Sequence, residues 1–442
     1  MASTYLQRNT SATDTGTKFT LSVWVKRSGL DSNNAIYKAS NDNNTNSFID
    51  IGINSHRFDW QIKNGSGTTF IRRRTNRLLR DTSGWYHLVA RYDSTLGTAS
   101  DRLRLYINGV LETSIDQDGT PDIPVNYSSQ LALSGVSQYI GRNINSASQF
   151  FNGSMSHFYM CVGYSYAPTE FGETDSTTGQ WKIKTSPSVS YGNNGWLILK
   201  DGNTITDQSS GSNNWSLAGG TLTQTQDNPS NNFAILNSIT PSSNNNGAGG
   251  TRHFNNSGGY DMRHSTLAVT TGKYYAEFYL ADMTGGFTIV GIQDTTQFDD
   301  YNFLTSSSRG YGYRSDGTKG NNNSSSSFGN SFTSGDTIGV AIDLDNNKIY
   351  FSKNGVWQNS GDPTSGATGT GSAYDIADGY DYCIATSSND AGTDQITDVN
   401  FGNGYFNVTA VSSAGTNASG NGIFEYDVPT GFTALSTKGL NL

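Results

Sequence analysis

The chain has 442 residues, enough for two or three domains, and a formal net charge of −9 at pH 7. This acidity argues against nucleic acid or an anionic membrane surface as the main partner. Only 34% of the residues are hydrophobic but 12% are aromatic, and Gly, Asn, Ser and Thr fill the gaps between short apolar runs. Such a composition predicts short β-strands joined by polar turns, so we expect an all-β protein.

The cysteines and the apolar runs exclude several classes of protein. Cys161 and Cys383 lie far apart in the sequence, which excludes a disulfide framework and any zinc-binding spacing. No apolar run approaches the ~20 residues of a membrane span, and the N-terminus lacks the apolar region of a signal peptide. We therefore expect no membrane insertion and no export by the usual route.

Short runs of alternating apolar and polar residues fill the first 160 residues: 19–28, 48–53, 58–63, 84–93, 102–110, 138–142 and 151–160. Each is bounded by Gly, Asn, Asp or Ser, as antiparallel strands of a β-sandwich are. Asn108-Gly109 predicts a type I′ turn, because both residues tolerate a positive φ.

Four of these runs, FTLSVWVKRS, GWYHLVARYD, LRLYINGV and FNGSMSHFYM, follow one another in an order that resembles the laminin-G-like, concanavalin A-like jelly roll. The resemblance covers residues 1–175 and implies two curved antiparallel sheets, with Trp24 and Trp85 in or beside the core. Glucanases of this family carry E-x-D-x-x-E on one strand. The nearest string here, residues 173–178, lacks the second Glu and consists of turn formers, so we expect no glycosidase activity.

Two features of this region leave alternatives open. Relatives often hold a calcium ion at a sandwich rim, and loops 41–46 and 116–119 offer Asp42, Asp116 and Asp118 as candidate ligands, although Asp- and Asn-rich turns without metal look the same. Residues 70–80 contain five arginines in an acidic chain: Arg72, Arg73, Arg74, Arg77 and Arg80. They form either a solvated strand paired with nearby aspartates or a contact surface for an acidic protein or an anionic glycan.

Residues 176–250 are predicted to be a connector. Its runs WKIK, GWLILK and NNFAIL are apolar enough to add strands or cover a sheet, and SSNNNGAGG at 242–250 is a low-complexity hinge.

Alternation resumes between residues 259 and 403. GKYYAEF, VGI, GYGYRSDG and GDTIGVAIDLDNNKIYFSKNG resemble the SPRY domain in order, with Asp343 and Asn354-Gly355 at the expected positions. The resemblance implies a second antiparallel sandwich, which acts as a binding module without catalytic residues. We expect it over residues 251–405, followed by a tail segment over 406–442.

The edge loops of this second sandwich are polar. Residues 320–331 and 360–375 either bind a partner by hydrogen bonding or are exposed connections. Tyr311, Tyr313 and Trp357 are the aromatic residues closest to a binding mouth, with a place in the core as the alternative. The hairpin sequence LYINGV also returns as IYFSKNGV, which we interpret as a shared way of turning a twisted strand.

The succession of both sandwiches with FGETDSTTGQW, YGNNGWLILK, DQSSGSNNW and YDVPTGFTALSTKGLNL resembles large virion-associated proteins of tailed phages, especially marine ones. It implies a non-enzymatic protein on the phage particle, made in the host cytoplasm and serving as a tail appendage or a capsid decoration. Expected partners are other virion proteins and further copies of the chain, with host surface polysaccharide as another candidate, and no cofactor besides the calcium candidate. The alternative is a free-standing, lectin-like adhesin. Five scattered histidines and no paired glutamates argue against an enzyme.

Overall fold

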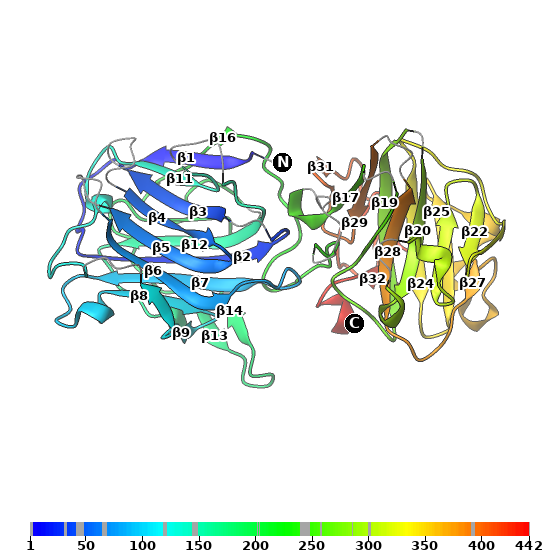
Figure 1. The fold of residues 1–442 in the computed structure, drawn as a ribbon, viewed down its shortest axis with the longest axis horizontal. Coiled ribbons are helices and arrows are strands. Elements are labelled where there is room, and N and C mark those ends of the chain that lie inside the picture. The colour runs from blue at the N-terminus through cyan, green and yellow to red at the C-terminus, as the bar shows by residue number, and fades with distance from the viewer. Residues whose placement is uncertain are drawn as a thin grey trace. The chain divides into compact units, whose positions relative to one another are not determined.

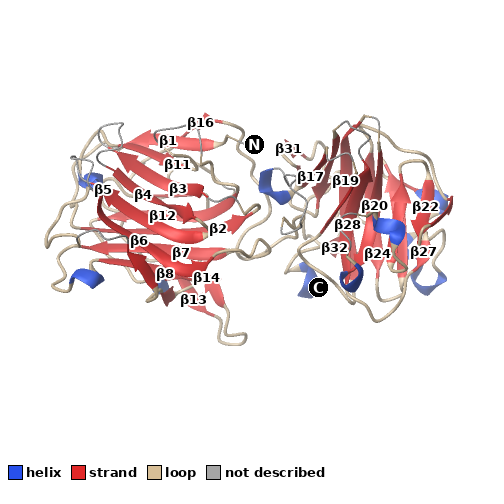
Figure 2. Ribbon diagram, in the orientation of Figure 1, coloured by secondary structure: helices blue, strands red, loops and turns tan. Residues whose placement is uncertain are grey.

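The computed structural model describes residues 3–30, 33–40, 48–63, 69–117, 122–143, 149–200, 202, 204–238, 248–256, 259–284, 286–298, 302–389 and 394–441. Two compact units divide the chain, Met1–Gln224 and Thr225–Leu442. Strands dominate both units, and the helices are short 3-10 turns (Figure 2). These turns are η1 (Ala99–Asp101), η2 (Gln130–Ala132), η3 (Pro168–Glu170), η4 (Ala248–Gly250), η5 (Thr295–Gln297), η6 (Leu304–Ser306), η7 (Gln358–Ser360), η8 (Pro363–Thr368) and η9 (Gly439–Asn441). The all-β prediction is confirmed.

The first unit is a sandwich of two antiparallel sheets (Figure 1). Among the described residues, one sheet has eight strands in the order β10 (Ile115–Gln117), β6 (Thr69–Leu78), β5 (Arg57–Lys63), β4 (Phe48–Asn54), β3 (Asn33–Ser40), β11 (Ser137–Ile140), β1 (Tyr5–Asn9) and β16 (Ser216–Gly219). The other has six in the order β15 (Trp196–Ile198), β12 (Gly153–Val162), β2 (Lys18–Arg27), β7 (Tyr86–Asp93), β8 (Leu103–Ile107) and β9 (Val110–Leu111). A separate hairpin joins β13 (Gly172–Thr174) and β14 (Trp181–Ile183).

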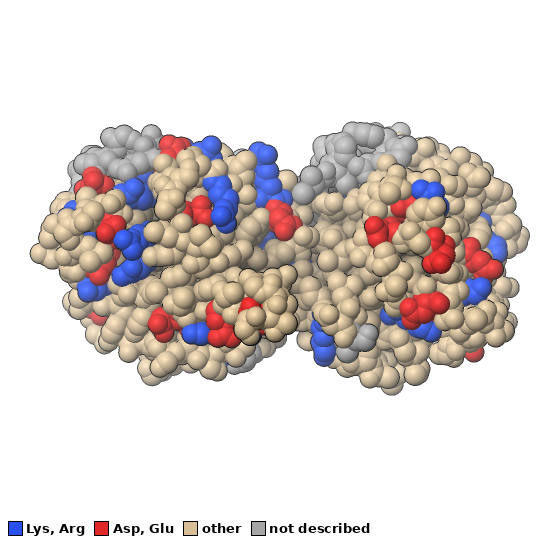
Figure 3. Space-filling model, turned by 90° about the horizontal axis from the view of Figure 1, so that it is seen from below, with Lys and Arg blue, Asp and Glu red and all other residues tan. Residues whose placement is uncertain are grey.

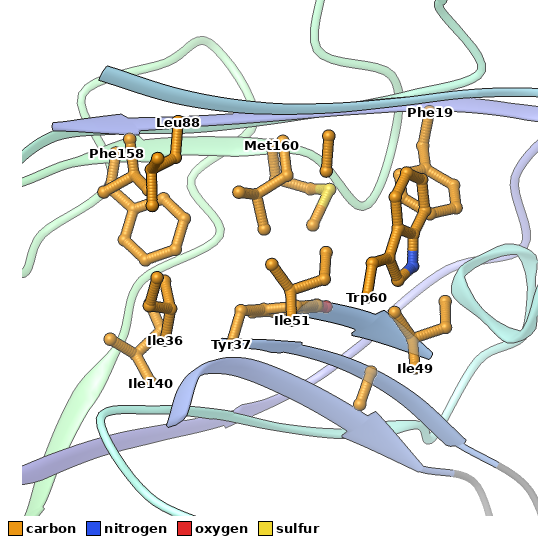
Figure 4. Close-up of a cluster of buried hydrophobic side chains, with 14 of the residues drawn as sticks. Phe19, Ile36, Tyr37, Ile49, Ile51, Trp60, Leu88, Ile140, Phe158 and Met160 are labelled. Atoms are coloured by element: carbon orange, nitrogen blue, oxygen red, sulfur yellow. The ribbon is translucent and has the colours of Figure 1, made fainter. Parts of the chain in front are cut away.

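Alternation along the strands builds the core of this unit. Side chains of the two sheets point toward one another across the sandwich, among them Phe19 and Leu88 from one sheet and Ile51 and Trp60 from the other (Figure 4). All four are fully buried. Burying a side chain of this size contributes about 1.5–3 kcal/mol, so the aromatic residues offset the low apolar content of the chain.

The second unit is also a sandwich of sheets, whose strands pair antiparallel apart from one short C-terminal strand. One sheet runs β17 (Arg252–Asn255), β29 (Gln395–Asn400), β19 (Lys273–Met283), β24 (Thr337–Asp343), β25 (Lys348–Lys353) and β26 (Val356–Trp357), with β27 (Tyr374–Asp375) paired to β25 and β32 (Thr433–Ala434) paired to β19. The other runs β18 (Tyr260–His264), β28 (Tyr382–Asn389), β20 (Phe287–Asp294), β21 (Gly310–Arg314), β22 (Thr318–Asn321) and β23 (Ser324–Ser327). A short pair joins β30 (Tyr405–Phe406) and β31 (Thr409–Ala410).

The two predicted Asn-Gly hairpins have the same geometry. Asn108 and Asn354 both have φ of 48°, and Gly109 and Gly355 both have φ of 78°, which confirms the type I′ turns. Each Asn side chain accepts a 2.8 Å hydrogen bond from the backbone N–H of the strand opposite. A later segment covers each glycine with an aromatic ring: a Cβ on Gly109 would lie 2.5 Å from the ring of Trp181, and a Cβ on Gly355 would lie 2.5 Å from the ring of Tyr426.

The structure divides the predicted connector and tail differently. Strand β15 pairs with β12 and β16 pairs with β1, so residues 176–224 complete the first sandwich. Residues 225–238 and 406–441 instead lie against the second sandwich, where Ala234 N–H donates to the Leu435 carbonyl at 2.9 Å. Their apolar residues, including Phe233 and Phe424, pack with Tyr275 and Tyr350 over the outer face of the sheet that contains β19. The apolar runs of both segments therefore cover sheets that would otherwise expose apolar side chains.

Candidate functional site

Strand β6 carries the arginine-rich sequence, and most of these arginines pair with local carboxylates. Arg72 donates from Nε and Nη2 to the two carboxylate oxygens of Asp59, at 3.0 and 2.9 Å. Arg74 Nη2 donates to Asp116 Oδ2 at 2.6 Å. Strand β6 lies between β5 and β10, so Arg74 is opposite both Asp59 and Asp116, and Arg72, two residues before it, reaches Asp59 diagonally.

The remaining three arginines do not extend one common surface. Arg73 is buried and contacts Asp122 at 3.3 Å, because alternation turns its side chain away from those of its neighbours. Arg77 contacts Glu112 at 3.2 Å, and Arg80 is exposed. The structure thus favours the solvated, aspartate-paired alternative over a single contact patch. In the view of Figure 3, acidic and basic side chains are likewise interspersed on a largely uncharged surface.

The calcium candidates gain no support from the described residues. Asp42 and Asp118 lie outside them. Asp116 is engaged by Arg57 and Arg74, at 3.2 and 2.6 Å from the same carboxylate oxygen. In the described part of the chain, no three His, Cys, Asp or Glu side chains gather where they could hold a metal.

Two of the three candidate binding aromatics are core residues. Tyr313 is 0% exposed and packs on Phe332 and Phe351, and Tyr311 is 6% exposed. The expectation that they line a binding mouth is wrong for both, since their side chains face the sandwich interior. Trp357 is half-buried against Tyr275, beside the apolar residues that cover the outer face of the sheet containing β19.

The two polar loops have regular structure. Residues 320–331 contain most of the β22–β23 hairpin, whose turn residues Asn322 and Asn323 have φ of 50° and 56°. All four residues of β23 are exposed at the edge of the sheet. Residues 360–375 contain η8 and β27, which pairs with β25. Both segments are therefore ordered connections that stay near the sheets.

The exposed group best suited to binding lies on the outer surface of the second unit. Tyr260 on β18 and Phe287 on β20 both pair with Asn389 of β28, one from each side, and their rings meet edge to face at 6.1 Å. Phe303 lies 5.1 Å from Tyr260, and the guanidinium of Arg314 lies 5.0 Å from the centre of the Phe287 ring. We call these four residues the Tyr260 cluster. Tyr260 is 37% exposed and the other three are partly exposed.

This cluster has the chemistry of a recognition surface. Aromatic faces bind apolar or planar groups, and a guanidinium above them adds a charged donor. Its members come from β18, β20, β21 and the segment after η5, and the motifs that mark β20 and β21 do not connect them with Tyr260 or Phe303. Only the strand order brings the cluster together, so sequence reasoning missed it.

A buried Ser–His pair in the first unit looks catalytic but is not. Ser22 Oγ lies 2.8 Å from His87 Nε2, and Trp181 Nε1 donates to His87 Nδ1 at 3.0 Å. An indole nitrogen only donates, so Nδ1 is the acceptor and Nε2 carries the proton. Burial lowers the pKa of His87 to about 3. The imidazole therefore donates to Ser22 and has no lone pair available to activate the hydroxyl.

Comparisons with known proteins identify both domains. A model of the concanavalin A-like lectin/glucanases superfamily matches residues 1–161, and a model of the SPRY domain matches residues 273–374. The chain therefore carries a concanavalin A-like domain in its N-terminal part and a SPRY domain in its C-terminal part, as the sequence motifs predicted. In the part of the chain that the structure describes, no helix is long and apolar enough to cross a membrane.

Individual relatives match only segments of the chain. An ATP-dependent RNA helicase, DDX1 of Xenopus laevis, is 37% identical over 91 residues, which is 21% of this chain and 12% of the helicase. The SPRY domain of human HERC1 is 24% identical, with a TM-score of 0.27, and the match covers 34% of this chain and 87% of that domain. Another human SPRY domain is 16% identical, with a TM-score of 0.24, covering 33% of this chain and 96% of that domain.

Proposed function

We propose that this chain is a non-enzymatic surface protein of a tailed-phage particle, a tail appendage or capsid decoration, that binds another virion protein through the Tyr260 cluster. The two domains are of families that include binding modules, and the particle setting comes from the sequence resemblance to virion-associated proteins. A free-standing adhesin is the competing setting. Host surface polysaccharide is a second candidate ligand, because aromatic faces also bind sugar rings.

The observation that supports this proposal most is the partial exposure of the Tyr260 cluster on a rigid sheet. Tyr260 and Phe287 are anchored by backbone pairing to β28, and Leu304, next to Phe303, is fully buried. Tyrosine and arginine are the side chains that dominate binding energy at protein interfaces. Little conformational entropy is lost when such fixed aromatic groups bind.

Co-sedimentation of the purified chain with phage particles tests the proposal. We expect the wild-type chain to bind, and Tyr260→Ala with Phe303→Ala to weaken binding at least about tenfold, since loss of a central aromatic contact costs 1.4 kcal/mol or more. Tyr164→Ala is the matched control, because Tyr164 is an exposed tyrosine (40%) of the first unit. Equal binding by the double variant and the wild type would remove the cluster from the proposal.

Two further measurements address the competing functions. A host polysaccharide array, with and without calcium, tests the adhesin. Binding there together with no binding to particles would replace the virion proposal. Release of reducing sugars from β-glucans would contradict the non-enzymatic assignment.

A further inference from the structure

Three side chains meet on the outer face of the eight-stranded sheet of the first unit: a lysine, an aspartate and an asparagine. Lys38 lies in β3 opposite Asp50 of β4 and opposite Tyr139 of β11, and Asn143 follows the end of β11. Lys38 Nζ lies 2.9 Å from Asn143 Oδ1 and 3.2 Å from Asp50 Oδ2. Although Lys38 is on the outer face of the sheet, it is only 3% exposed.

The surroundings of Lys38 fix both reacting groups. Its amine lies 4.4 Å from the ring centre of Phe48, which is itself buried. Asn143 Nδ2 donates to Gln149 Oε1 at 2.8 Å, so the carboxamide turns its carbonyl toward Lys38 and its NH2 toward Gln149. The amine, the carbonyl and a carboxylate are thus held together within hydrogen-bonding distance, as an intramolecular reaction needs.

We propose that Lys38 and Asn143 join in an autocatalytic isopeptide bond, with Asp50 as the proton carrier. Asp50 takes a proton from the Lys38 ammonium, and the freed amine lone pair attacks Cγ of Asn143. Asp50 then gives this proton to Nδ2 as the Cγ–Nδ2 bond breaks, takes the second proton from Nζ, and passes it to the departing ammonia. The new Nζ–Cγ amide remains and ammonia leaves, so no oxidant or co-reactant is needed and loss of ammonia drives the reaction forward.

The cross-link would join residues that are 105 positions apart in the sequence but adjacent in the sheet. Strands β3 and β11 are already paired from Tyr37–Ile140 to Ser40–Ser137, so bond formation requires no rearrangement of the backbone. The chain has only two cysteines, both buried and free, and the proposed bond would supply a covalent tie that they do not. The inference does not depend on what the protein binds.

Intact-mass measurement of the purified full chain tests this inference. We expect a mass about 17 Da below that of the sequence, for one lost ammonia, and a branched tryptic peptide containing both Lys38 and Asn143. Lys38→Arg, Asn143→Ala and Asp50→Ala should each restore the sequence mass. The branched peptide separates the cross-link from a succinimide at an Asn-Gly pair, which loses the same mass.

Lys63→Arg is the matched control. Lys63 lies over the same Phe48 ring, at 5.3 Å, yet on β5 rather than β3. The control should keep the mass deficit, and the thermal unfolding of each variant shows whether it is folded. A wild-type chain at its full sequence mass after prolonged incubation, or a deficit that survives Lys38→Arg, would overturn the inference.

Discussion

His87 shows how burial decides the charge of a single residue. Its ring stacks on Trp24, Trp181 lies at its Nδ1 edge, and the ring is fully buried, so a second proton, on Nδ1, would be placed in a dry site against the indole N–H. This burial lowers the pKa of His87 to about 3, against an ordinary value of 6.5. The unfolded chain therefore takes up a proton below pH 6.5 that the folded unit does not. The free energy of unfolding falls as the pH is lowered below 6.5.

We predict that His87→Gln abolishes this contribution to the acid sensitivity of the first unit. Between pH 7 and pH 4 the stability advantage of the wild type over the variant should shrink by about 3 kcal/mol, because each pH unit below 6.5 costs about 1.4 kcal/mol. Urea unfolding followed by tryptophan fluorescence measures it, since every tryptophan except Trp357 lies in this unit. An unchanged difference at the two pH values would contradict the pKa shift.

Glu277 is a buried titratable residue of the second unit, and its pKa shift changes stability with pH in the opposite direction. It is fully buried, and its oxygens accept hydrogen bonds from the backbone N–H groups of Glu425 and Tyr426, both at 2.8 Å. Tyr275 and Asn400 donate to it at 3.2 and 3.4 Å. Burial outweighs these donors and raises the pKa of Glu277 to about 7.

We predict that the second unit loses stability as the pH rises from 4.5 through 7, because the unfolded chain gives up the proton of Glu277 first. Glu277→Gln should remove that slope and, at pH 5, cost about 1–3 kcal/mol, since its NH2 group faces donors. Hydrogen exchange of the β19 amides, corrected for intrinsic rates, measures both effects. A wild-type slope of the other sign would refute this assignment.

Among the elements, the two Asn-Gly hairpins, one in each unit, are stabilised in the same way. Each has an Asn-Gly type I′ turn, and in each a later segment lays an aromatic ring over the glycine. Trp181 reaches Gly109 from β14, and Tyr426 reaches Gly355 from the C-terminal extension. Glycine is therefore required at both positions for two reasons, its positive φ and the absence of a Cβ.

We predict that Gly355→Ala destabilises the second unit by about 2–4 kcal/mol, the sum of a left-handed alanine and a displaced Tyr426 ring. Gly379→Ala is the control, because Gly379 has φ of 81° and open space around its missing Cβ, so only the backbone cost of about 1–2 kcal/mol applies. In the first unit Gly109→Ala is the corresponding test variant and Gly135→Ala is its control. Thermal unfolding ranks the variants, and equal losses within a pair would show that the aromatic contact is unimportant.

Local sequence patterns predicted the positions of the strands well, but not which strands lie side by side in a sheet. Alternation and Asn-Gly signals placed β2, β8 and β25 and both hairpins, because each depends on residues close in sequence. The polar run at 320–331 instead pairs as β22–β23, although four consecutive serines show no alternation. The partners of Arg72 and Arg74 depend on strand order, and so does the Tyr260 cluster, which no local pattern reports.

At the scale of the whole molecule, each sandwich is completed by segments that lie outside its family match. Residues 196–219 add β15 and β16 to the first unit. Residues 225–238 and 406–441 cover one sheet of the second unit and bury Phe233 and Phe424. The apolar runs GWLILK and NNFAIL indicated added strands or cover for a sheet, whereas the sheet that each one joins depends on contacts between distant parts of the sequence.

We predict that deleting residues 406–442 destabilises the second unit and leaves the first intact. The deletion would expose Tyr275 and Phe233 and remove two hydrogen-bond donors from Glu277. Hydrogen exchange should rise across β19 and β24. The unfolding midpoint of the first unit, followed by tryptophan fluorescence, should not change. Deleting only residues 440–442 is the control, and similar exchange in both truncations would contradict a structural role for the extension.

The pairing of residues near Ala234 with residues near Leu435 places the two ends of the second unit side by side. Asn232 N–H also donates to Thr437 at 3.0 Å. A module whose entry and exit coincide can be transplanted into a surface loop of an unrelated host protein, or rejoined end to end and reopened elsewhere, without pulling its sheets apart.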